Sequence, residues 1–161
     1  MLHEDDEDDT EYYIDPDQEW YGDFRTRLEA NLDFTDEALM AFIAEATAYP
    51  NITITESALG LIVDHKGLLP QQRRVLASNS YFTAAHLQNR LRRVTLIHDL
   101  KHGALSDALF TLCVDFKDDP VHRALLNNHS LSHSQLTILM EVGANKAVRN
   151  LAAQRLGLRR A

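Results

Sequence analysis

The sequence predicts an all-α fold, an α-solenoid of about nine short paired helices. Three observations predict it. A nine-residue pattern recurs along the chain, helix start and stop signals alternate from Asp17 onward, and no segment shows the strict apolar and polar alternation of a β-strand. The 161 residues are enough for one domain with a sizeable core, so we expect a single helical domain over residues 17–161.

The recurring pattern is Asn, two variable residues, an apolar residue, Ser or Thr, three variable residues and a second apolar residue. Copies begin at Asn31, Asn51, Asn79 and Asn128, and a degenerate copy begins at His102. The mean step is (128 − 31)/4, about 24 residues, which is typical of stacked repeats. One unit of this length cannot cover its own apolar face, so neighbouring units must cover each other.

The apolar positions of the pattern therefore predict the core. The last position supplies a stripe of Leu39, Leu59, Leu87, Phe110 and Leu136, with Phe34, Ile54, Phe82, Leu105 and Leu131 beside it. We expect the Asn of each copy to bond the backbone of the turn between helices.

Each helix is predicted from its start signal. The first, about 18–30, follows a run of acids and carries Trp20, Tyr21 and Phe24. The helices at about 35–48, 55–65, 83–100 and 106–116 each begin at the Ser or Thr of the pattern, which we expect to accept from free first-turn amides. These cap residues are Thr35, Thr55, Thr83 and Ser106. Between the helices expected at 55–65 and 83–100, Pro70 opens a further helix at about 70–78.

Three further helices complete the chain. Asp119 and Pro120 predict an N-cap and a first helical residue for 120–127. Ser132 with Gln135 forms a capping box for 132–142, which Gly143 ends. Asn145 caps 146–156, and Gly157 ends it.

A second pattern precedes the Asn, with an apolar residue seven positions before it and a basic residue six before it. Phe24 and Arg25 fill it, as do Val121 and His122, while Arg73 fills the basic slot before Asn79 and Val148 with Arg149 begins a last unit. The combined pattern resembles the leucine-rich repeat variant family, a bacterial relative of the HEAT-like helical repeats, over roughly residues 24–156. The resemblance implies a right-handed stack of short paired helices that binds a partner on one face, without enzymatic activity.

Composition argues against several other classes of protein. No apolar stretch approaches the ~20 residues that span a bilayer, and the first residues are acidic rather than a basic and apolar leader. Cys113 is the only cysteine, which excludes an intrachain disulfide and suits a cytoplasmic protein. We therefore expect no membrane contact, and we interpret Cys113 as a core residue.

Catalytic and metal-binding constellations are weak. No Ser lies in a Gly-flanked nucleophile turn and no Gly-rich phosphate loop is present, so we expect no enzyme, no catalytic residue and no cofactor. His98 with His102, and His129 with His133, have the spacing of zinc ligands. Because His102 and His129 fall at or beside expected helix starts, we do not expect either pair to share a helical face.

The charge is divided along the chain. Residues 1–24 hold eleven acids and no Lys or Arg, residues 25–64 sum to −5, and residues 65–161 sum to +8, which gives the net −8. This division predicts an acidic, disordered arm at residues 1–16, ahead of a basic body.

The candidate binding residues are basic and aromatic. A solenoid can align Arg73, Arg74, Arg90, Arg92, Arg93 and Arg149, together with Lys101, Arg155, Arg159 and Arg160, into a stripe that contacts phosphates or an acidic protein. The alternative is a solvated face, with Arg25, Arg73 and Arg149 bonded to structural carbonyls. Trp20 and Tyr21 either seal the end of the stack or dock on a partner.

We therefore expect a protein-binding scaffold, such as an adaptor or inhibitor encoded by a bacterium or phage, that grips one macromolecular partner. The alternative is a nucleic-acid-binding solenoid that uses the basic stripe, with the acidic arm as a competitor or nucleic-acid mimic. No sequence feature indicates an oligomeric state.

Overall fold

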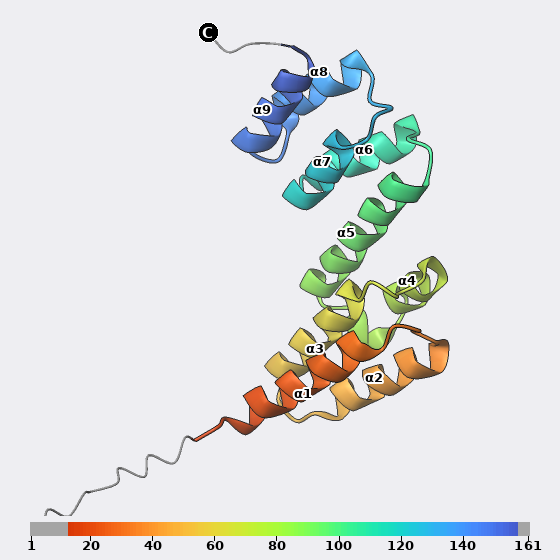
Figure 1. Cartoon of the computed structure of the whole chain (residues 1–161), viewed down its shortest axis with the longest axis vertical. Helices are drawn as coiled ribbons and strands as arrows, with labels where there is room; N and C mark the ends of the chain where they lie inside the picture. Colours follow the sequence, from red (N-terminus) through yellow and green to blue (C-terminus); the bar gives the residue numbers. More distant parts are fainter. Residues whose placement is uncertain (1–12, 158–161) are drawn as a thin grey trace, which may run out of the picture. The chain divides into compact units, whose positions relative to one another are not determined.

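The computed structural model describes residues 13–157, and every regular element in that part of the chain is a helix (Figure 1). The elements are α1 (Pro16–Ala30), α2 (Asp36–Ala48), α3 (Ile52–Asp64), α4 (Pro70–Ala77), a 3-10 helix (Ser80–Phe82), α5 (Ala85–His102), α6 (Asp107–Phe116), α7 (Asp119–Leu126), α8 (His133–Val142) and α9 (Lys146–Arg155). The all-α prediction is confirmed. Each expected helix has a counterpart whose ends lie within three residues of the predicted ones.

The chain divides into two compact units between Ile62 and Val63, in the last turn of α3. We name residues 1–62 unit 1 and residues 63–161 unit 2. The sequence had led us to expect one helical domain over residues 17–161. The division nearly coincides with the change in charge. Residues 13–62 hold ten acids and two bases, whereas residues 63–157 hold seven acids and twelve bases.

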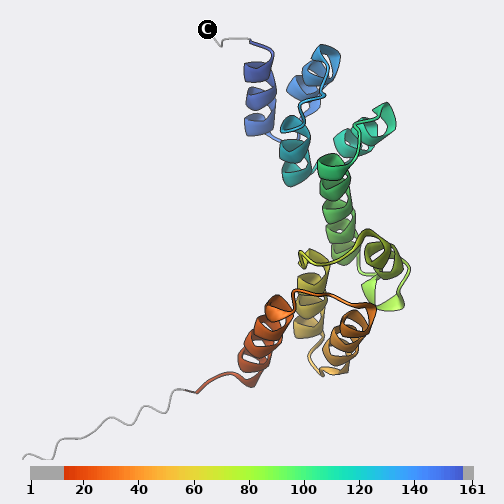
Figure 2. The ribbon, with the colours of Figure 1, turned by 45° about the vertical axis from the view of Figure 1, so that its right-hand side comes forward.

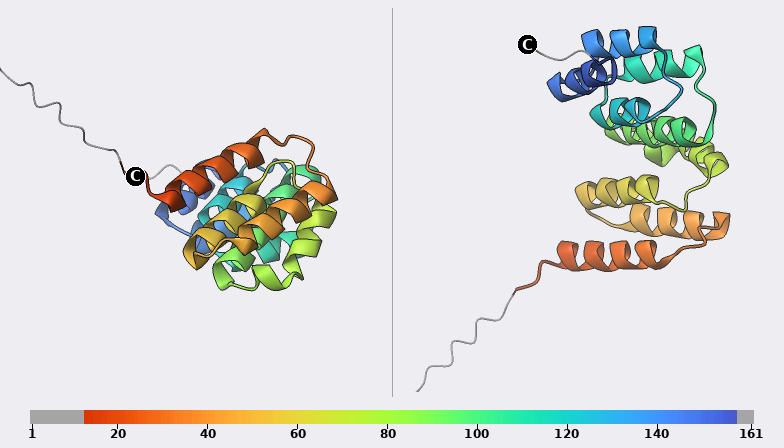
Figure 3. Two further views of the ribbon diagram at one scale, coloured as in Figure 1. Left: turned by 90° about the horizontal axis from the view of Figure 1, so that it is seen from below. Right: turned by 45° about the horizontal axis from the view of Figure 1, so that its top comes forward.

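Unit 1 is held together by aromatic packing between α1 and α2. Phe24 is fully buried and meets Phe42 edge to face, with 5.5 Å between the ring centroids. Arg27 of α1 forms an ion pair with Glu45 of α2. Figure 3 shows α1, α2 and α3 side by side in this unit.

Unit 2 shows the stacking that the repeat predicts. Helix α7 contacts both α5 and α9, while α6 packs on α7 and on α8, and α8 packs on α9. Figure 2 shows α7 between α5 and α9. Helices α5, α7 and α9 therefore form one row of the stack, and α6 and α8 form the other. The core between the rows includes Leu100, Phe110, Leu125, Leu139 and Val148.

The predicted core stripe is confirmed, because all five of its members are buried: Leu39, Leu59, Leu87, Phe110 and Leu136. Of the residues expected beside it, Ile54 and Leu105 are only half-buried. Cys113 is fully buried, which confirms it as a core residue.

Several predicted caps are confirmed. Thr35, Ser106 and Ser132 each accept a hydrogen bond from a first-turn amide, at 3.1, 3.1 and 3.2 Å. Gln135 completes the capping box of α8, since its side-chain oxygen accepts from the Ser132 amide. Asn145 caps α9 by accepting from the Val148 amide at 3.0 Å.

Two other predicted caps are wrong. Helix α3 begins at Ile52 because Asn51 accepts from the Thr53 amide, and Thr55 is buried and donates instead to the Ala46 and Tyr49 carbonyls. Thr83 follows the 3-10 helix that Asn79 caps, and α5 begins only at Ala85.

The predicted cap of α7 is wrong by one residue. Asp118 is the N-cap and accepts from the Val121 amide at 3.1 Å, which places Asp119 in the first turn. Both residues can accept amide hydrogen bonds, so composition did not distinguish them.

The expected arm, residues 1–16, lies outside the described residues except for its last four. Asp15 caps α1 by accepting from the Asp17 amide at 2.9 Å, and Pro16 is the first residue of that helix. The end of the expected arm therefore belongs to α1. Nowhere between residues 13 and 157 does a helix combine the length and apolar character that crossing a membrane requires.

Candidate functional site

Three arginines of the predicted basic stripe bond the backbone. Arg73 donates to the Leu68 carbonyl at 2.8 Å, and Arg149 donates to the Gly143 carbonyl at 2.9 Å. Arg155 donates to the carbonyls of Leu126 and Asn128. Burial lowers the pKa of Arg73. The alternative that arginines of the basic slot bond structural carbonyls is therefore confirmed for Arg73 and Arg149.

The same alternative is wrong for Arg25, which donates to Glu29 at 2.7 Å instead. His122, which takes the basic slot before Asn128, is fully buried and bonds the Cys113 carbonyl at 2.9 Å. The basic slot thus has a structural role in unit 2.

Three further arginines on α5 have side-chain partners. Arg90 forms an ion pair with Asp64 at 2.6 Å, and Arg93 forms one with Asp118 at 2.6 Å. The hydrogen bond to Asp118 raises the pKa of Arg93. The guanidinium carbon of Arg92 lies 5.0 Å from the centroid of the Phe116 ring, in a cation–π contact. The guanidinium groups of these three arginines, which we expected from the sequence to contact a partner, therefore already have contacts within the protein.

Within the part of the chain that the structure describes, two members of the basic set have side chains with no described hydrogen bond, ion pair or ring contact. Arg74 on α4 and Lys101 on α5 are both exposed. Arg159 and Arg160 lie outside the described residues. The structure therefore does not leave the predicted stripe as a continuous row of available cations in the part of the chain it describes.

The aromatic candidates Trp20 and Tyr21 are both half-buried in unit 1. The ring of Trp20 stacks on Tyr49 with 4.1 Å between centroids and on Phe24 with 5.1 Å. Tyr49 also donates to Asp17 at 2.6 Å, and this hydrogen bond raises the pKa of Tyr49 to about 12. Trp20 thus contributes to the packing of unit 1, as one of the two sequence interpretations predicts.

Unit 2 contains two adjoining hollows along α7. The first, about 590 Å³, lies between α5 and α7, and the second, about 380 Å³, lies between α7 and α9. Arg123 and Asn127 line both, so we name the pair the α7 groove. Its cations are Lys101, Arg123 and Arg155, its amides are Asn127, Asn128 and Gln154, and its apolar residues include Ile97, Leu100, Leu126 and Leu151.

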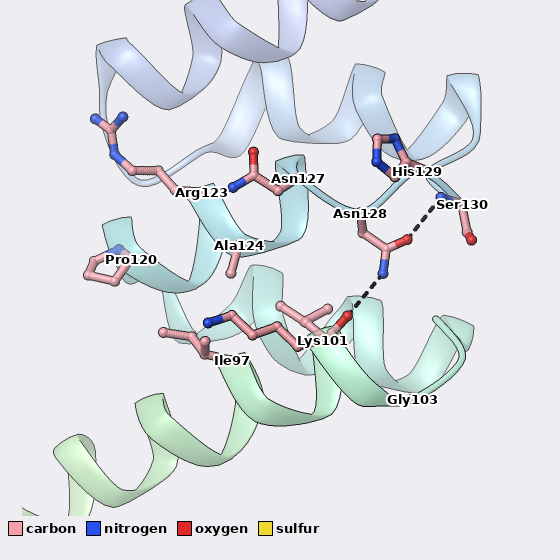
Figure 4. Close-up of a pocket in the computed structure, with 11 residues that line it drawn as sticks. Ile97, Lys101, Gly103, Pro120, Arg123, Ala124, Asn127, Asn128, His129 and Ser130 are labelled. Carbon is pink, nitrogen blue, oxygen red and sulfur yellow. Dashed lines mark hydrogen bonds between the residues drawn. The ribbon is translucent and has the colours of Figure 1, made fainter. Parts of the chain in front are cut away.

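The side chains of the groove differ in availability. Asn128 donates to the Leu100 carbonyl at 3.3 Å and accepts from the Ser130 amide at 2.9 Å, so its amide is structural (Figure 4). Arg123 pairs with Asp119 at 2.8 Å. Asn127 and Lys101 are exposed and have no side-chain partner among the described residues. Figure 4 shows the Lys101 side chain extended between α5 and α7.

No acidic residue is among the described residues that line the α7 groove. It therefore offers ammonium, guanidinium and amide donors beside apolar side chains, a combination that suits an extended peptide with carboxylates.

A third hollow, about 380 Å³, lies between α4 and α5 and contains two of the predicted arginines, Arg73 and Arg92. Both have the partners described above, and Gln88 in the same hollow donates to the Phe82 carbonyl at 2.6 Å. This hollow offers fewer available donors than the α7 groove.

The histidine pairs do not form a larger cluster. His98 and His102 are both in α5, with 4.5 Å between ring centroids, so the expectation that they do not share a face is wrong. Over residues 13–157 there is no group of three or more His, Cys, Asp or Glu side chains that could hold a metal ion. Burial raises the pKa of Cys113 to about 11, which disfavours the nucleophilic thiolate.

Sequence reasoning missed Arg123, Asn127 and Gln154. A signal for the first two was present, because Pro120, Arg123, Ala124 and Asn127 recur at helical spacing on α7. That face alternates with the buried positions Val121 and Leu125. The clue was the exposed face of this short helix, on which Arg123 and Asn127 are one turn apart.

Comparison with known proteins gave no match to any protein family, curated protein or solved structure. The resemblance to the leucine-rich repeat variant family therefore stays a prediction from the residues that carry it.

Proposed function

We propose that this protein is a non-enzymatic helical-repeat scaffold that binds one protein partner through the α7 groove. Such a scaffold acts as an adaptor or inhibitor in the cytoplasm. The stacked row of α5, α7 and α9 supplies a surface that no single helix could form. The observation that carries the proposal is that two adjoining hollows share Arg123 and Asn127 and have no acidic residue among their described lining residues.

The availability of donors supports binding at this surface. Lys101 and Asn127 are exposed and have no described side-chain partner, so a ligand can bond them without breaking a contact within the described protein. The apolar groups of Ile97, Leu126 and Leu151 can bury the side chains of a bound peptide. Polar donors would then set the register of the peptide and the apolar contacts would add affinity.

A protein partner is better supported than a nucleic acid. Affinity for nucleic acid depends on the number of phosphates that Lys and Arg neutralise. In unit 2, Arg73, Arg149 and Arg155 bond backbone carbonyls, and the ion pairs of Arg90 and Arg93 would have to be broken or shared. The described lining of the α7 groove also lacks the aromatic rings on which bases stack.

The test is affinity capture with the full chain from native lysate, with and without nuclease. We expect at least one protein to be retained after nuclease treatment and to be lost with Lys101→Glu. Lys66→Glu is the matched control, because Lys66 is also an exposed lysine of unit 2 without a described partner, and it does not line the groove. Loss of every captured protein on nuclease treatment would support the nucleic-acid alternative.

Equal capture by Lys101→Glu and the wild type would refute the groove as the binding surface. Circular dichroism of both variants checks that they remain folded, which we expect because an exposed side chain without a partner contributes little to stability.

A further inference from the structure

We propose that the hollow between α4 and α5 is a binding site for the phosphomonoester group of a phosphorylated small molecule. We name this hollow the α4 pocket. It is separate from the α7 groove, since the two surfaces share no described lining residue. The described residues that line it all belong to unit 2. The inference therefore goes beyond the proposed function.

The polar residues of the α4 pocket lie at helical spacing on its two helices. Arg73 is on α4, and Gln88, Arg92 and Thr95 are four and three residues apart on α5. Side chains at these spacings lie on one face of a helix. Each helix therefore contributes one arginine to the pocket, as part of the face that lines it.

Both guanidinium groups are held in place by groups that carry no negative charge. Arg73 donates through Nη2 to the Leu68 carbonyl at 2.8 Å. The guanidinium carbon of Arg92 lies 5.0 Å from the centroid of the Phe116 ring. The carbonyl takes up one N–H of Arg73, and a ring contact involves the flat face of a guanidinium rather than its N–H groups. Most N–H donors of both arginines therefore remain available to a ligand.

The charge of the α4 pocket is not balanced within the described chain. No acidic residue is among its described lining residues. Burial lowers the pKa of Arg73 more than the carboxylate of Asp99 raises it. A guanidinium stays protonated at neutral pH, so Arg73 has lost hydration without gaining an ion pair among the described residues. A bound anion would supply the missing counter-charge.

The donors of the pocket match a phosphomonoester better than a carboxylate. A phosphomonoester carries a charge of about −1.5 to −2 at pH 7 and has three acceptor oxygens. Two guanidinium groups balance that charge. The amide of Asn89 and the hydroxyl of Thr95 also line the pocket, and neither makes a described hydrogen bond. A carboxylate has one charge and two oxygens, so it would leave one arginine without a counter-charge.

The size of the pocket favours a small ligand. Its volume is about 380 Å³, which lies in the range of about 300 to 1,000 Å³ typical of small-molecule sites. Ala77 and Leu91 add apolar surface for the organic part of the ligand. A nucleic-acid backbone fits less well, because each of its phosphodiesters carries a single negative charge.

The test is a titration of the full chain, followed by ¹H–¹⁵N NMR in a buffer without phosphate. We expect phenyl phosphate to bind with a Kd on the order of 0.1 mM and to shift the side-chain amide signal of Asn89. Benzoate, which has the same ring and a carboxylate, should bind about tenfold more weakly. Absence of saturation by phenyl phosphate up to about 10 mM, or equal affinity for benzoate, would overturn the proposal.

A single-stranded oligonucleotide without terminal phosphates tests the nucleic-acid alternative. At the same total concentration of phosphate groups, we expect it to leave phenyl phosphate bound. Displacement of phenyl phosphate by the oligonucleotide would overturn the proposal in favour of a phosphodiester site.

Variants on the two helices locate the site. We expect Arg92→Gln to weaken phenyl phosphate binding about tenfold, because it removes a charged donor. Arg74→Gln is the matched control, since Arg74 is an exposed arginine of α4 that does not line the pocket, and we expect a change of about twofold or less. An equal loss in both variants would show attraction to the general positive charge and would overturn the proposal.

Asn89→Asp tests the site without removing an arginine. Asn89 is exposed and its side chain makes no described hydrogen bond, so we expect the variant to fold, which its NMR spectrum checks. The new carboxylate would occupy the donors and repel phosphate, so we expect binding to weaken about tenfold. Wild-type affinity would overturn the proposal.

Lys101→Glu distinguishes the α4 pocket from the α7 groove. A loss of phenyl phosphate binding equal to that of Arg92→Gln would place the phosphate in the α7 groove and would overturn the proposal. Failure of the phosphate titration leaves the captured protein and its loss with Lys101→Glu as they are, so the two proposals fail separately.

Discussion

Asn145 donates its side-chain amide to the carboxylate of Asp119 at 2.7 Å, while its side-chain oxygen accepts from the Val148 amide at 3.0 Å. Unit 1 contains the same arrangement, in which Asn51 donates to Asp17 and accepts from the Thr53 amide. In both units, an Asn before one helix therefore joins that helix to the first turn of the helix two before it. This bond connects successive members of a stack.

The first prediction concerns this connection. We expect Asn145→Ala to lower the free energy of unfolding by about 0.5 to 2 kcal/mol, because it removes the N-cap of α9. Asn145→Asp keeps the capping oxygen but places a carboxylate against Asp119, so we expect it to destabilise as well. Urea denaturation measures both, with Asn127→Ala as an exposed control. Wild-type stability of Asn145→Asp would show that the bond to Asp119 contributes nothing.

The second prediction concerns acid pH. The hydrogen bonds from Arg123 and then Asn145 lower the pKa of Asp119. An unfolded Asp titrates near pH 3.9, so this stabilising contribution is present above about pH 4 and is lost as the pH falls through the lowered pKa. Asp119→Asn should therefore be less stable than the wild type at neutral pH, and the difference should shrink below about pH 4. A difference that grows on acidification would contradict the assignment.

The third prediction concerns His122. The Ala144 amide donates to its Nδ1 at 2.9 Å, so Nε2 carries the proton and donates to the Cys113 carbonyl. We expect His122→Ala to cost about 2 to 5 kcal/mol, because it leaves a cavity and two backbone groups without partners. Chemical denaturation measures the loss, with the exposed His133→Ala as control. Equal stability of the two variants would mean that the link is not formed.

The fourth prediction compares two apolar residues of α8. Leu136 is 6% exposed and Ile138 is 41% exposed. We expect Leu136→Ala to lower the free energy of unfolding by about 2 to 5 kcal/mol. We expect Ile138→Ala to lower it by clearly less, because folding buries a smaller part of the Ile138 side chain. Denaturant titration of both variants tests the orientation of the helix. The reverse order would mean that the face of α8 is misassigned.

The fifth prediction concerns Cys113, which is fully buried and whose pKa is raised to about 11 by burial. We expect its thiol to react slowly with a disulfide reagent at about pH 8, and to react fully in denaturant, because only the exposed thiolate is nucleophilic. Absorbance of the released thiolate follows the reaction. Rapid stoichiometric labelling of the native chain would exclude the buried position.

Local signals account for the accuracy of the predicted helices. A cap such as Thr35 or Ser132 bonds an amide three residues away, so both partners are visible in a short stretch of sequence. The limit appears where two cap residues compete. Asn51 and Thr55 are four residues apart, and burial of Thr55 against the Ala46 carbonyl left Asn51 as the cap.

The candidate site was harder to predict, because the availability of a charge depends on distant residues. Arg93 is 25 residues from Asp118, and Arg155 is 27 residues from the Asn128 carbonyl that it contacts. The sequence identified both as cations but could not show that the fold already engages them. Arg123 and Asn127 gained their importance only when α5 and α9 packed on either side of α7.

The sequence by itself determined the helical class, most helix boundaries, the buried stripe and the division of charge, because these depend on periodicity, capping and composition over short stretches. Tertiary structure alone decided which arginines stay available, which Asp caps α7, where the chain divides into units and where the groove lies. These features depend on packing and on pairing between residues far apart in the chain, which no local pattern specifies.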